Sequence, residues 1–79
     1  MPSKKVVRAA IERAWFERQP LRITYVDGNF IETIREVRIT SVIMDRHETR
    51  IDAVDIVRGD RRHFRLDRIA QAEVLRPVA

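Results

Sequence analysis

Residues 21–45 read LRITYVDGNFIETIREVRITSVIMD, and this stretch decides the fold class. Apolar and polar side chains alternate from Leu21 onward, which is the period-two pattern of a half-buried strand. The segment Asp27-Gly28-Asn29 interrupts the alternation and predicts a hairpin turn in which Gly28 can adopt a positive φ. Residues 30–45 are too many for one straight strand, so we expect a sharp bend near the middle of this segment.

The same alternation continues to the end of the chain. In the long stretch, one face is expected to carry Arg35 with four residues of the same parity: Val37, Ile39, Ser41 and Ile43. Polar turns at 45–48 and 58–60 separate further predicted strands, which are Thr49–Val57, Arg61–Leu66 and Glu73–Arg76. A short helical turn is expected at Asp67–Ala70.

A helix is predicted before the strands, over residues 3–17. Ser3 can cap it, Pro20 closes the segment, and one face is apolar: Val7, Ala10, Ile11, Ala14 and Trp15. We interpret Trp15 as a core residue and Phe16 as an exposed contact for a partner. Phe30 is expected to pack back on the sheet, with stacking on a base as the alternative.

One helix followed by about five short strands predicts a mainly β (α+β) fold. The expected architecture is a small, strongly bent antiparallel sheet that closes as a barrel over residues 21–76. A chain of 79 residues has room for one domain, which we expect to span residues 1–79.

Composition excludes several classes of protein. With 44% hydrophobic and 35% charged residues the chain is globular in type, and the absence of cysteine excludes disulfides, thiolate metal sites and a cysteine nucleophile. No apolar run approaches the roughly 20 residues of a membrane span, and the N-terminus lacks the apolar region of a signal peptide. We therefore expect a cytoplasmic protein without a membrane partner.

Charge gives the first functional indication. The formal net charge is +4, and 14 of the 16 basic residues are arginine, whose planar guanidinium binds phosphate or carboxylate through two hydrogen bonds. On the strand predicted at Arg61–Leu66, Arg61, His63 and Arg65 project from one face and can converge on one anionic ligand. The alternative is a solvated face of an edge strand that discourages aggregation.

Catalysis and metal binding receive no support from the sequence. His47 and His63 lack the spacing of metal ligands, and the carboxylates are scattered among arginines as ion-pair partners. The two serines lie outside any nucleophile motif. We expect a protein that is not an enzyme and holds neither a metal nor a cofactor.

The stretch Arg61-Arg62-His63-Phe64-Arg65-Leu66-Asp67-Arg68-Ile69 resembles the closing R-x-F-R-L-D-R-I signature of the WYL domain of bacterial transcriptional regulators. The resemblance covers roughly residues 6–75 and includes three further segments: Ala9–Tyr25, which is similar to the family's entry helix and first strand, Arg35–Val37 and Ala53–Asp55. Two departures stand out. Thr49-Arg50-Ile51 occupies the position of the Trp-Tyr-Leu tripeptide, and Ile39 occupies that of a family proline.

The resemblance implies an Sm-like, SH3-type barrel that senses a ligand and often regulates transcription. Ligands of the family are thought to resemble nucleic acid, including single-stranded DNA. The family's basic pocket would fall on Arg35, Arg65 and Arg68, with Arg50 at the tyrosine of the tripeptide; Arg61 and His63 would extend it. For Arg68 the alternative is an anchor that holds the last turn against the sheet.

Two functions follow as hypotheses. The first is a regulatory, ligand-sensing module that binds a phosphate-bearing ligand, single-stranded nucleic acid or a nucleotide, through its arginine-rich face. The second is an interaction module that forms homo-oligomers, dimers above all, or serves as an accessory to a larger transcriptional or defence regulator. Family members usually carry a helix-turn-helix before the domain, and these residues show none, so we expect a ligand binder or an accessory partner.

Overall fold

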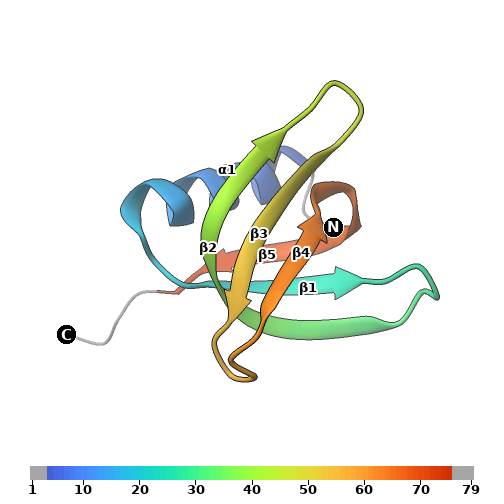
Figure 1. Ribbon diagram of the computed structural model, residues 1–79. Coiled ribbons are helices and arrows are strands. Elements are labelled where there is room, and N and C mark those ends of the chain that lie inside the picture. Colours follow the sequence, from blue (N-terminus) through green and yellow to red (C-terminus); the bar gives the residue numbers. More distant parts are fainter. Residues whose placement is uncertain (1–3, 76–79) are drawn as a thin grey trace.

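One helix is followed by five strands, as the sequence predicts (Figure 1). The computed structural model describes residues 4–75, so Ser3, the expected cap, and Arg76 lie outside the described part. The elements in chain order are α1 (Lys4–Glu17), β1 (Leu21–Val26), β2 (Glu32–Met44), β3 (Thr49–Asp55), β4 (Arg61–Arg65) and β5 (Ile69–Val74). A short 3-10 helix, Leu66–Arg68, links β4 to β5 and overlaps the helical turn expected at Asp67–Ala70. The last strand begins at Ile69 rather than at the predicted Glu73, because residues from Ile69 onward pair with β1.

The strands form a single antiparallel sheet in the order β4-β3-β2-β1-β5. In this order β4 and β5 are the two edges, so the expected barrel takes the form of an open sheet. The long strand β2 curves through the molecule in Figure 1 and carries both halves of the sheet, with β1 and β5 on one side and β3 and β4 on the other. The bend predicted for this segment is therefore confirmed.

A bulge causes that bend and also changes which side chains face the core. The pairing of β2 with β3 shifts between Ile39 and Ser41, which leaves Thr40 as an extra residue. Such a bulge bends its strand and reverses the alternation beyond it. Ile39 therefore lies in the core, whereas Ser41 pairs across from the outward-facing Asp52. The prediction that Val37, Ile39, Ser41 and Ile43 share one face is wrong beyond the bulge.

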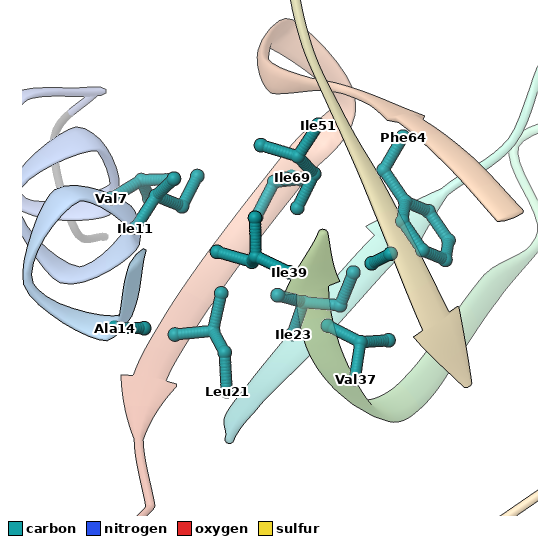
Figure 2. Packing of buried hydrophobic residues seen from close by; sticks show 11 residues of the cluster. Val7, Ile11, Ala14, Leu21, Ile23, Val37, Ile39, Ile51, Phe64 and Ile69 are labelled. Carbon is teal, nitrogen blue, oxygen red and sulfur yellow. The ribbon is translucent and has the colours of Figure 1, made fainter. Parts of the chain in front are cut away.

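The core lies between α1 and the concave side of the sheet. Figure 2 shows aliphatic side chains of the helix meeting those of the strands, with Phe64 at the far end. Val7, Ile11 and Ala14 are the buried residues of α1. Trp15 was expected in the core but is 44% exposed. It lies one position further round the helix than Ala14, so it reaches the edge of the contact with the sheet.

The hairpin between β1 and β2 has an unexpected backbone. Oδ1 of Asp27 accepts hydrogen bonds from the backbone N–H groups of Asn29 (2.8 Å) and Ile31 (3.0 Å). The left-handed residue of the turn is Phe30, at φ 61°, rather than Gly28. Phe30 is also 89% exposed, so the prediction that it packs back on the sheet is wrong.

Candidate functional site

Four of the six arginine and histidine side chains singled out in the sequence lie on one face. The β3–β4 pairing sets Arg50 opposite Arg65, Asp52 opposite His63 and Val54 opposite Arg61. The alternate positions, Ile51 and Phe64, are buried, so the other set points away from the core. We call this set the outer β3–β4 face: Arg50, Asp52, Val54, Arg61, His63 and Arg65.

Arg50 and Arg65 place two guanidinium groups at directly opposed positions. Like charges in such positions repel and destabilise strand pairing. Carboxylates partly offset this: Asp67 binds Arg65 through two hydrogen bonds of 3.1 and 2.8 Å, and Asp52 lies 3.9 Å from Arg50. The hydrogen bonds between Arg65 and Asp67 raise the pKa of the arginine and lower that of the aspartate.

Asp52 organises the middle of the outer β3–β4 face. One carboxylate oxygen lies 2.5 Å from Nδ1 of His63, and the other accepts a 3.0 Å hydrogen bond from the Ser41 hydroxyl. The hydrogen bond with His63 is the main cause that lowers the pKa of Asp52 below its ordinary value, with Ser41 adding to it and partial burial opposing it. The face therefore carries a fixed carboxylate between its basic groups.

Arg61 differs from the other arginines of the face. It is exposed, and its guanidinium makes no hydrogen bond or ion pair with any residue between 4 and 75. Its cross-strand neighbour is the apolar Val54. Among the basic groups of the outer β3–β4 face, Arg61 is the one whose charge no described side chain neutralises.

Arg35 does not join this face. Its position on β2 pairs with the buried Ile23, so its side chain points to the concave side and is only 15% exposed. Its Nη1 lies 3.2 Å from Oδ2 of the fully buried Asp55, and its guanidinium stands 5.8 Å from the centre of the Phe64 ring. Arg35 is thus a partner of a buried carboxylate.

Arg68 lies apart from both groups. It belongs to the 3-10 helix after β4, and its guanidinium reaches the β1–β2 hairpin, where a Cβ on Gly28 would meet Nη1 at 3.5 Å. A shallow pocket of about 320 Å³ lies there, lined by Arg68 and by Phe30 of the hairpin. The resemblance implied one basic pocket, whereas the structure separates Arg35 and Arg68 from the outer β3–β4 face.

Two residues that lie beside the site were not predicted from the sequence to belong to it. The Tyr25 hydroxyl accepts a 3.4 Å hydrogen bond from the backbone N–H of Arg65, and the Tyr25 ring meets Phe64 edge-on with centroids 5.0 Å apart. The alternation predicts a strand from Leu21 onward, but it does not indicate a role for Tyr25. Ser41 was predicted to share a face with Val37 and Ile39, because the position of the bulge at Thr40 could not be predicted.

Among residues 4–75 there is no group of three or more histidine or acidic side chains placed to hold a metal ion. The described helix is too short and too polar to cross a bilayer.

Comparison with known proteins identifies the family. A model of the WYL domain matches residues 6–74. The chain belongs to the WYL domain family. Among solved structures, proteasome accessory factor B/C (PafBC) of Arthrobacter aurescens matches with a TM-score of 0.81 and 27% identity over 92% of this chain. The matched region is 12% of that PafBC chain. Comparison with curated proteins found no significant match.

The family assignment confirms the resemblance read from the sequence. In this WYL domain the closing signature, residues 61–69, runs through β4 and the 3-10 helix into β5. The tripeptide position, Thr49-Arg50-Ile51, opens β3, with Ile51 in the core and Arg50 on the outer face. The departure from the family pattern therefore exchanges an aromatic side chain for a cation next to Arg65.

Proposed function

We propose that this WYL domain is the ligand-sensing part of a regulatory system in the bacterial cytoplasm. In this proposal the outer β3–β4 face binds a phosphate-bearing ligand, which is single-stranded nucleic acid or a nucleotide. Membership of the WYL family and the likeness to PafBC support a regulatory role without catalysis. The arginine side chains of the outer β3–β4 face are the reason for proposing a phosphate-bearing ligand.

The observation that carries the proposal is the opposition of Arg50 and Arg65. A bound phosphate between two guanidinium groups would convert their repulsion into two charge-assisted contacts. Arg61, without an ion pair in the described part of the chain, offers a third guanidinium four residues from Arg65 along β4, on the same face. Four residues of a strand span about 13 Å, close to twice the phosphate repeat of an extended nucleic-acid backbone.

The expected mode of binding is recognition of the backbone rather than of the bases. The imidazole of His63 is the only ring on the outer β3–β4 face, so stacking contributes little there. Phosphate contacts release counterions, and each one lost by mutation lowers the slope of log affinity against log salt by about one. Strong dependence on salt is therefore required by the proposal.

The test is fluorescence anisotropy with a labelled, mixed-sequence single-stranded oligonucleotide at low and near-physiological salt. Arg61→Ala is the most direct variant, because Arg65→Ala would also leave Asp67 without its partner. We expect Arg61→Ala to weaken binding and to reduce the salt slope by about one. Arg13→Ala removes the same charge from α1 and serves as the matched control.

Two results would overturn the proposal. One is the absence of binding at low salt by the wild-type chain. The other is an equal loss of affinity in Arg13→Ala and Arg61→Ala, which would mean that only net charge matters.

A further inference from the structure

Two of the three phenylalanines lie almost wholly in solvent, at opposite ends of β1. Phe64 is in the core, whereas Phe16 is 88% exposed and Phe30 is 89% exposed. Phe16 precedes the start of β1 and Phe30 follows its end. Large apolar side chains exposed in groups mark interaction surfaces.

The first ring borders a groove at the end of α1, which we call the helix-end groove. Its volume is about 590 Å³, Trp15 and Phe16 form one side, and Ile39 of β2 lies against it. Arg18 and Arg38 line it too, and none of its lining residues is acidic. Nη1 of Arg38 donates a 3.3 Å hydrogen bond to the carbonyl oxygen of Arg18, which joins the two elements. The groove therefore suits an apolar side chain accompanied by a carboxylate.

The second ring belongs to a surface that offers this combination. We call it the hairpin tip: Phe30, Ile31, Glu32 and Ile34. All four are exposed, and the Glu32 carboxylate makes no hydrogen bond or ion pair with any residue of the described part. The backbone holds Phe30 at a positive φ, which is costly for a bulky residue. A strained, solvent-exposed aromatic ring is explained if the turn presents it to a binding site.

We propose that the hairpin tip of one copy of this chain docks into the helix-end groove of a second copy. Phe30 and Ile31 fill the apolar part of the groove, and Glu32 pairs with the arginines there. Apolar shape and charge are complementary between these two surfaces of the same chain. The occupant is therefore a second copy of this chain.

The assembly is head-to-tail. Groove and tip lie at the two ends of β1, whose six residues span about 20 Å, and Figure 1 shows the end of α1 and the hairpin on opposite sides of the molecule. One pair of molecules therefore leaves one groove and one tip unoccupied. Contacts of this kind continue into chains or close into a ring.

The test measures mass in solution by sedimentation equilibrium over a range of protein concentrations. We expect the wild type to exceed its monomer mass of 9.4 kDa increasingly as concentration rises. Phe16→Asp disables the groove and Phe30→Asp disables the tip, so each variant alone should be monomeric. An equimolar mixture should form a one-to-one pair, because one variant retains an intact tip and the other an intact groove.

A matched control keeps the result specific. Val57→Asp introduces the same charge at an exposed apolar residue in the β3–β4 turn, and it should associate as the wild type does. Circular dichroism verifies that all variants are folded. Exchange of charges adds a second readout: Glu32→Lys and Arg38→Glu should each weaken association about tenfold, and combining them in one chain should restore much of it.

A monomeric wild type at high concentration overturns the proposal and leaves the groove to another protein segment. A mixture of the two Phe variants that stays monomeric overturns it as well. The outer β3–β4 face takes no part in the contact, so oligonucleotide binding by the monomeric variants separates this inference from the proposed function.

Discussion

Asp55 is a fully buried carboxylate at the end of β3, and it contacts both the turn into β4 and Arg35 of β2. Oδ1 accepts hydrogen bonds from the backbone N–H groups of Val57 (3.1 Å) and Arg58 (2.9 Å). Oδ2 receives the guanidinium groups of Arg35 (3.2 Å) and Arg58 (3.1 Å). Burial alone would raise the pKa of Asp55, but the hydrogen bonds from Arg58 and Arg35 lower it below the ordinary value. The residue is ionised and fully satisfied.

Removing this carboxylate should destabilise the fold strongly. Asp55→Ala leaves the largely buried cation of Arg35 without a carboxylate and frees two backbone donors in the turn. The loss of one partner from a buried ion pair costs about 3–5 kcal/mol. Unfolding in urea measures it, with Arg13→Ala as a control that breaks an exposed pair with Glu17 and costs about 0.5 kcal/mol. A loss below 1 kcal/mol for Asp55→Ala would contradict this account.

At the scale of elements, α1 is followed by a residue with a strained backbone conformation. Arg18 follows the helix at φ 56°, and its N–H and that of Gln19 bond back to carbonyl oxygens of the last turn. Glycine is the usual residue in this left-handed position. Arginine stands there at a cost in conformational energy.

The substitution Arg18→Gly should therefore stabilise the protein by about 0.5 kcal/mol, since relief of the left-handed strain exceeds the added freedom of the unfolded chain. Arg8→Gly makes the same change inside α1 and should destabilise by about 1 kcal/mol. Thermal unfolding of the two variants tests the contrast in sign. If both variants lose stability equally, the conformation of Arg18 is not strained.

An element can be predicted from the sequence when the residues that determine it lie close together in the chain. Alternation and turn residues are local, so the helix and the first four strands could be predicted from the sequence. The fifth strand was predicted too late, because β5 begins at Ile69 where it pairs with Tyr25 of β1. The bulge at Thr40 could be expected only as a bend, because its position depends on the register with β3. Beyond Thr40 the side chains no longer alternate as predicted, so Ser41 lies on the opposite face from Val37 and Ile39.

The same distinction applies to the candidate site. Arg61, His63 and Arg65 alternate on one short strand, so their common face is a local property. The resemblance placed Arg35 in the basic pocket, whereas its side chain points inward and pairs with Asp55 of another strand, a contact that depends on the packing of the sheet. Arg68 reaches the β1–β2 hairpin because the 3-10 helix turns it there, and no periodicity in the sequence carries that information.

At the scale of the whole molecule, three aspartates tie stability to acid pH. Asp52, Asp55 and Asp67 all have pKa values below the ordinary value of 3.8 in the folded state. Each is bound to a basic side chain: Asp52 by His63, Asp55 by Arg58 and Arg35, and Asp67 by Arg65. These pairs hold the turn after β3, the outer face and the 3-10 helix, so they act on most of the β3–β5 region.

The sign of the effect follows from proton binding. Because the folded pKa values are lower than the unfolded ones, the unfolded chain takes up more protons as the pH falls through this range, and acid favours unfolding. The stabilisation is fully present above about pH 5 and is lost progressively as the pH falls below about 4. Melting temperatures recorded from pH 7 to pH 2 should show a plateau and then a fall.

Asp67→Asn should lower the plateau and flatten the fall. Glu12→Gln, which removes an exposed carboxylate of α1, should leave the profile unchanged. A fall that begins near pH 6 in the wild type would mean that these three aspartates do not govern acid unfolding.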